Sequence, residues 1–206
     1  MSSTASTSPF PSSTPSPPSL THLNSQGEAH MVSITHKAPT ARSATATCTL
    51  SFSSPTTHAA LTSATLHKGD ALAVARIAGI QAAKLTSTLI PLAHPSLQIT
   101  YVNVGIEVLA PAESSSSAAA DVKSTNTTPR ESGGARITAR VDCEGKTGVE
   151  MEALTAAQVA GLALYDMLKG VDKGMCLGEG RVVAKRGGKS GGWRWDEEAQ
   201  EVVKES

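Results

Sequence analysis

The stretch 67–95 reads HKGDALAVARIAGIQAAKLTSTLIPLAHP and predicts one long helix with a polar residue just outside each end. A Gly-Asp turn precedes a run of Ala, Leu, Val and Ile, which is typical of a helix start. Pro91 predicts the end, because proline has no backbone N–H donor and disfavours helix in the preceding residue. Lys68 and His94 therefore stand on loops, where a rigid scaffold displays functional groups.

A second long helix is predicted over 149–169. Its middle, ALTAAQVAGLAL, has almost no polar face, and a helix that is apolar all round must be buried on every side. A single domain offers it one sheet face, so we expect its remaining side to contact another subunit. The ends are polar, with Glu150 and Glu152 in the first turn and Asp166 and Lys169 in the last. A carboxylate at position 166 opposes the helix dipole and needs another reason to be there.

Four further segments predict strands, and the first three of them alternate apolar and polar residues. They are 48–52, 102–108, 137–143 and 181–185, and a short helix is predicted over 56–66. The order strand, helix, two strands, helix, strand is typical of an α+β fold, with an antiparallel sheet and helices packed on one face. Residues 110–134 are rich in Ser, Ala, Thr and Gly, too weakly apolar for a core element, and predict a long hairpin loop.

The 206 residues suffice for one domain with a sizeable core, which we expect over 21–192. Residues 1–20 are almost entirely Ser, Pro and Thr and predict a disordered tail or a linker, while 193–206 predict a charged tail. The first segment has neither the Arg-rich amphipathic character of a mitochondrial transit peptide nor the apolar centre of a secretory signal. Residues 22–46 are polar and turn-rich and predict an extended arm along the surface.

Charge and cysteine content narrow the class of partner. Lys plus Arg and Asp plus Glu balance at 18 each, so no overall field favours nucleic acid or a membrane. The apolar runs fall short of the roughly 18 residues of a membrane span. Cys48, Cys143 and Cys176 lie far apart, without CxxC or Cys-His spacing. We therefore expect buried reduced thiols, an intracellular compartment that is mitochondrial or cytoplasmic, and no metal site.

Five separated segments carry a resemblance to a known family. In chain order they are THLNSQGEAHMV, KGDALAVARIAGIQAAK, IPLAHP, KTGVEMEALTAAQVAGLALYDMLK and GGKSG. In these segments the chain resembles the cyclic pyranopterin monophosphate synthases, the molybdenum cofactor biosynthesis protein C family. The resemblance runs from Thr21 to about Gly191, with one gap near 110–134.

The resemblance implies a ferredoxin-like fold and a homohexamer assembled as a trimer of dimers. It implies a lyase that needs no cofactor and converts a small-molecule substrate, a cyclised guanosine triphosphate derivative, into cyclic pyranopterin monophosphate and diphosphate. Such an enzyme must hold a triphosphate with cations and move protons on the ring and sugar. On matching positions the resemblance implies that Asp166 is the proton-transferring carboxylate and that Lys68 and Lys169 are its cationic partners.

A further set of residues is implied to contact the substrate. These are Leu92, Ala93, His94, Glu150, Met151, Glu152, Arg42 and Lys185. An arginine fork suits phosphate oxygens, and Lys189 in the terminal GGKSG is a weaker phosphate candidate. The chain departs from the family at Ala93, where cysteine is usual, and at Ser33, where we expect aspartate. Because the three catalytic candidates are retained, we expect position 93 to contact the substrate through its backbone.

Two other function classes remain open from the sequence. The first is a non-catalytic relative of the same fold that binds a pterin or nucleotide without turning it over. The second is an RNA-binding sheet, which would stack bases on paired aromatic residues. The predicted strands offer little beyond Phe52 and Tyr101 for that purpose, so this class is disfavoured.

The spacing of the polar helix ends predicts an active site shared between two subunits. Glu152 and Asp166 belong to one continuous predicted helix. At roughly 1.5 Å per residue they are separated by about 21 Å along its axis. Two groups so far apart cannot easily act on one reacting centre, whereas a two-fold partner can bring its own Asp166 near this chain's Glu152. The alternative is that a long triphosphate substrate bridges part of that distance within one chain.

Overall fold

The structure, a computed structural model, describes residues 22–24, 26–63, 69–112 and 131–205. The chain divides into two units, Met1–Val32 and Ser33–Ser206. The described part of the first unit is a tight turn in which Leu23 and Ala29 form an antiparallel bridge. The side-chain oxygen of Asn24 accepts hydrogen bonds from the backbone N–H groups of Gln26 and Glu28, each at 2.9 Å.

The second unit contains a six-stranded antiparallel sheet with the order β2-β3-β1-β4-β5-β6. The strands are β1 (Thr40–Ser51), β2 (Gln98–Leu109), β3 (Gly134–Gly145), β4 (Cys176–Arg186), β5 (Gly192–Asp196) and β6 (Glu201–Glu205). The helices are α1 (Pro55–Thr62), α2 (Ala71–Lys84), α3 (Thr86–Leu89) and α4 (Glu150–Leu168). The first four strands with α2 and α4 give the βαββαβ order of a ferredoxin-like fold, so the predicted α+β class is confirmed.

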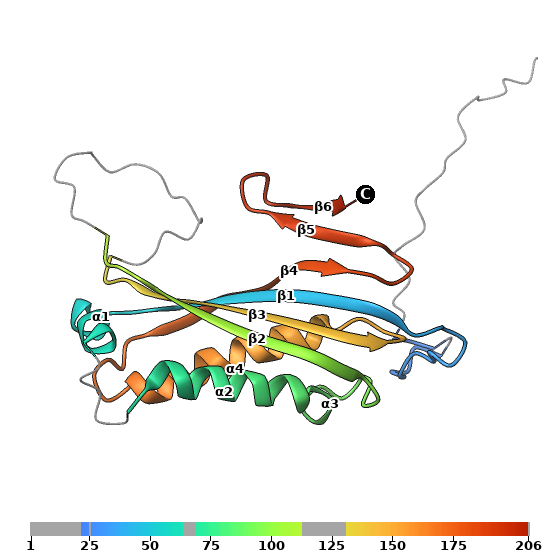
Figure 1. Ribbon diagram of the computed structural model, residues 1–206, viewed down its shortest axis with the longest axis horizontal. Helices are drawn as coiled ribbons and strands as arrows, with labels where there is room; N and C mark the ends of the chain where they lie inside the picture. Colours follow the sequence, from blue (N-terminus) through green and yellow to red (C-terminus); the bar gives the residue numbers. More distant parts are fainter. Residues whose placement is uncertain (1–21, 25, 64–68, 113–130, 206) are drawn as a thin grey trace, which may run out of the picture. The chain divides into compact units, whose positions relative to one another are not determined.

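The helices α2 and α4 lie side by side on one face of the sheet and run in opposite directions (Figure 1). Alternate residues of β1 explain this layering, because Ala44, Ala46 and Cys48 are buried while Thr45 and Thr47 are half-buried on the other face. No described helix is long and apolar enough to cross a membrane.

Small residues allow α2 and α4 to approach closely. A Cβ at Gly79 of α2 would lie 2.8 Å from the carbonyl oxygen of Ala156 and 3.1 Å from the Cβ of Ala160, both in α4. It would also lie 3.1 Å from Cγ2 of Val104 in β2. A residue larger than glycine would therefore push the two helices apart or away from the sheet. Much of the α4 surface that we expected to meet another subunit is covered by α2 instead.

Three elements of the predicted fold differ from the structure, and Cys176, which was expected to be a buried thiol like Cys48 and Cys143, is exposed. The single helix predicted before Pro91 is interrupted at Leu85, whose N–H donates to both Gln81 and Ala82. The hydroxyl of Thr86 also donates to the Ala82 carbonyl at 3.1 Å, a local bond that competes with regular helix. The surface arm predicted for 22–46 contributes the first residues of β1 from Thr40 onward.

The third difference is the charged tail predicted for 193–206, because β5 and β6 form a hairpin there. Its turn is closed by Asp196, whose carboxylate accepts from the N–H groups of Glu198 and Ala199 at 3.1 and 3.0 Å. The predicted hairpin of β2 and β3 is confirmed by their antiparallel pairing. Most of the long loop predicted between them, 113–130, lies outside the described residues.

Candidate functional site

The predicted site residues that the structure describes fall into two groups at opposite ends of α4. Glu150, Met151 and Glu152 occupy its first turn and Asp166 its last. Because α2 runs antiparallel to α4, the loop 92–94 that follows α2 and α3 lies toward the first group, and the start of α2 lies toward the second (Figure 1). Lys68 lies outside the described residues.

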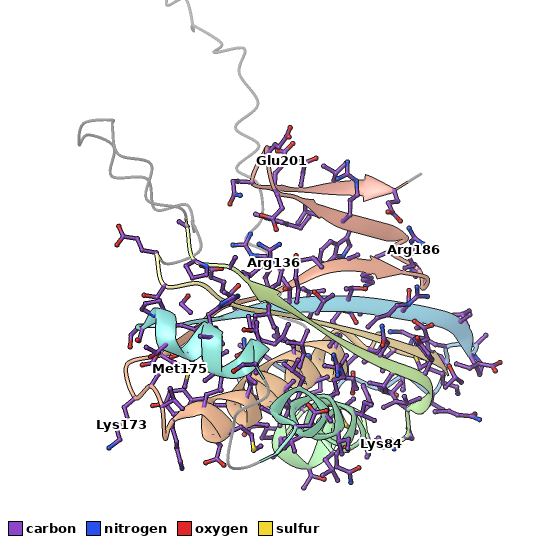
Figure 2. The ribbon with its side chains drawn as sticks, turned by 60° about the vertical axis from the view of Figure 1, so that its left-hand side comes forward. Lys84, Arg136, Lys173, Met175, Arg186 and Glu201 are labelled. Carbon is purple, nitrogen blue, oxygen red and sulfur yellow. The ribbon has the colours of Figure 1, made fainter. Side chains whose placement is uncertain are left out.

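The group at the C-terminal end of α4 pairs a carboxylate with a lysine. Oδ1 of Asp166 lies 2.6 Å from Nζ of Lys169, and both side chains are more than half exposed. The hydrogen bond and charge of Asp166 raise the pKa of Lys169, so this lysine stays protonated. A cavity of about 440 Å³ opens beside them, lined by Tyr165, Lys169, Gly170 and Lys173. Lys173 projects outward from this end of the helix layer (Figure 2).

Asp172, in the turn that follows α4, has a structural role. Its buried carboxylate accepts from the backbone N–H of Ser53 at 2.8 Å, the Thr57 hydroxyl at 3.0 Å and the Gly174 N–H at 2.9 Å. The Ser53 hydroxyl also donates to it. Burial disfavours its ionisation, but these hydrogen bonds outweigh burial and lower the pKa of Asp172. The carboxylate thus ties the chain after α4 to the start of α1.

The group at the N-terminal end of α4 holds two carboxylates in different states. Glu150 forms an ion pair with Lys185 of β4, with 2.9 Å between Oε1 and Nζ. Glu152 is only 4% exposed. Burial raises the pKa of Glu152 to about 7, a backbone N–H bond opposes this increase, and the charge of Glu150 adds to it. One residue therefore anchors a cation, while the other can hold or release a proton near neutral pH.

Arg42 of β1 borders the same end of α4. Its Nε donates to the carbonyl of Gly145, 103 positions away, at 2.9 Å. The neighbouring Cys143, opposite Arg42 in the strand register, is buried. Burial raises the pKa of Cys143, the charge of Arg42 lowers it, and Glu152 and Glu150 raise it. Sequence reasoning treated Cys143 as a core thiol only, since no local pattern indicates that it lies beside these charges.

The loop 92–94 and the turn 187–191 complete this end. In the loop, the N–H of Ala93 donates to the carbonyl of Ile90 at 3.0 Å, and all three residues are half-buried. The turn carries Lys189 and contains three glycines in the left-handed region, with φ of 82°, 80° and 73°. A side chain on Gly188 would collide with the Arg42 guanidinium, so the turn lies directly against Arg42.

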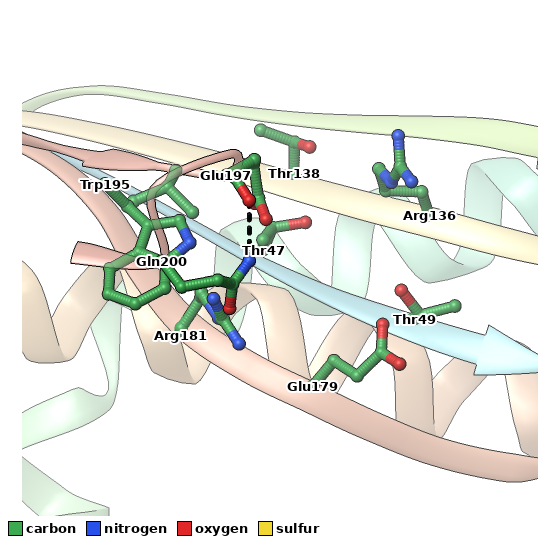
Figure 3. A pocket seen from close by; sticks show the side chains of 10 residues that line it. Thr47, Thr49, Arg136, Thr138, Glu179, Arg181, Trp195, Glu197 and Gln200 are labelled. Carbon is green, nitrogen blue, oxygen red and sulfur yellow. Dashed lines mark hydrogen bonds between the residues drawn. The ribbon is translucent and has the colours of Figure 1, made fainter. Parts of the chain in front are cut away.

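A second concavity, of about 900 Å³, lies on the sheet face away from the helices (Figure 3). The guanidinium of Arg181 sits 4.5 Å from the ring centre of Trp195, and Gln200 donates to the Glu197 carbonyl at 2.7 Å. The Trp195 indole N–H is buried and has no hydrogen-bond partner among the residues that the structure describes. Arg136 and Glu179 also line this concavity, so its arginine and carboxylate charges balance. It includes none of the predicted site residues.

The described residues contain no cluster of His, Cys, Asp and Glu that could hold a metal ion. The two groups instead offer carboxylates for proton transfer and lysines and an arginine for binding anions. Comparison with known protein families gives one finding. The family model described as "MoaC family" matches residues 31–188, from the end of the first unit through β4. The hairpin of β5 and β6 lies beyond the matched residues.

Proposed function

Because the chain belongs to the MoaC family, an enzyme family of molybdenum cofactor biosynthesis, we propose that it converts a cyclised dihydroguanosine triphosphate into cyclic pyranopterin monophosphate. The proposed reaction is of the lyase type and releases diphosphate. The observation that carries the proposal is the exposed Asp166–Lys169 pair at 2.6 Å, next to a cavity with a second lysine.

At that end of α4, the proposed chemistry divides between the two residue types. Forming a cyclic phosphate requires a substrate hydroxyl to lose a proton as its oxygen bonds to phosphorus and diphosphate leaves. Asp166 is the proposed proton-transferring group, and Lys169 holds its carboxylate in place by a charge-assisted hydrogen bond. Lys169 and Lys68 are the proposed cations that neutralise charge on the phosphates.

At the other end of α4, the proposed role is substrate binding. Arg42 and Lys185 present cations, Glu150 fixes the lysine, and Glu152 offers a carboxyl group whose pKa lies near 7. Met151 is partly exposed beside Glu152, and the loop formed by Leu92, Ala93 and His94 lies toward the same end. Ala93 is compatible with this role if the loop contacts substrate through backbone groups.

The separation of the two groups supports a site shared between subunits of a homo-oligomer, which we propose is a hexamer built from dimers. Glu152 and Asp166 stand about 21 Å apart along α4, too far for both to act on one reacting centre within a chain. Large apolar side chains are also exposed on the helix layer, among them Ile77 at 67% and Leu162 at 57%. Exposed apolar side chains of this size suit a contact with a second copy.

The direct test is product formation. Purified protein incubated with the cyclised triphosphate should release diphosphate and yield the pterin product. Asp166→Asn should lower turnover by roughly 10²–10⁴ with little change in substrate binding, as for loss of a general acid or base. Lys169→Ala and Lys68→Ala should weaken both turnover and binding. Glu107→Gln, an exposed carboxylate on β2, is the matched control and should behave like wild type.

Folded wild-type protein that binds the triphosphate without product would instead establish the non-catalytic relative. Near-normal turnover in Asp166→Asn would assign that carboxylate to structure. The RNA-binding alternative loses one of its two aromatic residues, because Phe52 is fully buried in the core while Tyr101 is exposed.

Mixing inactive variants tests the shared site. Glu152→Gln and Asp166→Asn proteins are unfolded together, refolded and assayed. If sites are shared, a mixed dimer contains one site with both native residues, so activity should return. If each site lies within one chain, every site keeps one lesion and the mixture stays inactive.

A further inference from the structure

We propose that the C-terminal hairpin of β5 and β6 positions the glycine-rich turn 187–191 against Arg42, through an ion pair between Arg186 and Glu205. Arg186 and Glu205 are thus positioning residues that act through the turn, and neither is proposed to contact substrate. The inference rests on the proposed function, because it concerns how tightly the Arg42 end of the site holds a phosphate-bearing substrate.

The hairpin contacts the residues on both sides of the turn 187–191. Arg186, the last residue of β4, is bonded through Nε and Nη2 to the two carboxylate oxygens of Glu205 in β6, at 3.0 and 3.4 Å. Strand pairing places Trp193 opposite Lys185 and Gly192 opposite Glu205. The residues just before and just after the turn are therefore both fixed to the hairpin. Figure 2 shows Arg186 at the edge where β4 turns toward β5.

The turn 187–191 also contacts the candidate site at Arg42. Side chains at Gly187 and Gly188 would collide with the Ala41 carbonyl and the Arg42 guanidinium respectively. Both glycines have left-handed φ values, so backbone geometry and space each exclude a larger residue there. The turn is closed by the Gly191 N–H, which donates to the Gly188 carbonyl at 3.2 Å.

Arg42 is consequently held between two supports. Its Nε donates to the Gly145 carbonyl, and the turn lies against its guanidinium. Lys185, next in sequence to Arg186, reaches Glu150 at the start of α4. If the hairpin were loosened, the turn would become ordered only when substrate binds. The entropy lost in that ordering would reduce the affinity for substrate. The proton-transfer group at the other end of α4 would be unaffected.

The expected signature is a rise in KM with little change in kcat, which distinguishes positioning of a binding element from loss of a catalytic group. Glu205→Gln should raise KM roughly two- to fivefold, because a partly exposed ion pair is worth at most about that factor. Deleting 192–206 should raise KM further, by roughly tenfold. Glu201→Gln, an exposed carboxylate on the same strand, is the matched control and should leave KM unchanged. Exchanging the charges, as Arg186→Glu with Glu205→Arg, should restore most of the loss.

A second measurement, which does not depend on catalytic turnover, tests whether the hairpin holds the turn 187–191 in place. Trypsin cleaves after Lys189 at the tip of the turn, so Glu205→Gln should speed cleavage there, as mass spectrometry of early fragments will show, while Glu201→Gln should not. Unchanged cleavage at Lys189 and unchanged KM in Glu205→Gln would overturn the inference, as would charge exchange without rescue. A wild-type protein without turnover would refute the proposed function alone, since the rate of cleavage at Lys189 still tests whether the hairpin holds the turn.

Discussion

The buried carboxyl of Glu152 should make the protein less stable as pH rises, and Glu152→Gln should remove that dependence. Glutamine keeps the shape and most of the hydrogen-bonding capacity of the protonated acid but cannot ionise. In the folded chain the pKa of Glu152 is raised from 4.5 to about 7, chiefly by burial. The folded state therefore retains a proton that the unfolded chain has already released.

The sign and size of this change in the free energy of unfolding follow from proton linkage. Between pH 4.5 and about 7 the unfolded chain loses this proton first, so the free energy of unfolding falls as pH rises and the loss is complete above pH 7. Each pKa unit is worth about 1.36 kcal/mol, which gives a loss of roughly 3 kcal/mol. Below pH 4.5 wild type and Glu152→Gln should differ least, and at pH 8 the variant should be the more stable by up to that amount.

Urea unfolding of wild type and Glu152→Gln at one protein concentration gives the difference between their free energies of unfolding, which we call the gap, at pH 5 and at pH 8. Other titrating groups are common to both proteins and cancel in the comparison. Glu107→Gln, which removes an exposed carboxylate, should show nearly the same gap to wild type at both pH values. If the gap for Glu152→Gln stays constant, or if wild type gains relative stability as pH rises, then Glu152 is ionised in the folded protein and its burial has been misjudged.

Three further changes test the fold. Gly79→Ala should lower the free energy of unfolding by roughly 1–3 kcal/mol through overpacking, whereas Gly178→Ala, with open space around it, should change it by less than about 0.5 kcal/mol in urea titrations. Asp172→Asn should cost roughly 1–3 kcal/mol, because an amide cannot accept all of the hydrogen bonds that the carboxylate receives; a wild-type midpoint in urea would contradict this. Deleting 1–20 or 112–132 should leave the melting temperature and activity near wild type, and a folding collapse would show that a packed element had been removed.

The order of elements could be predicted from the sequence because each depends on a local pattern. The apolar run of α4 and the alternation in β2 and β3 extend over many residues, so their periods are clear. The start of β1 was missed because its buried residues there, Ala44 and Ala46, differ little in polarity from the Ser and Thr between them. The hairpin of β5 and β6 was missed because its many charged residues resemble a solvated tail.

The candidate site was less predictable, because its geometry depends on strand register. Arg42, Lys185 and Glu150 come from two strands and a helix, and only the paired sheet places them at one end of the fold. The state of Glu152 could not be predicted either, since a charged residue in a first helical turn is usually exposed. That Asp166 has Lys169 as its partner, by contrast, follows from their spacing of three residues on a helix.

Close packing through glycine and alanine gives the α2–α4 contact a low cost in side-chain entropy and makes it intolerant of larger side chains. Neither residue has side-chain rotamers to lose on folding, so the contact orders without the cost that leucine or methionine would add. Mutational tolerance there is one-sided, because almost every substitution enlarges the side chain. In a deep mutational scan, Gly79, Ala156 and Ala160 should accept fewer replacements than Ile137 or Phe52, whose volume can also decrease.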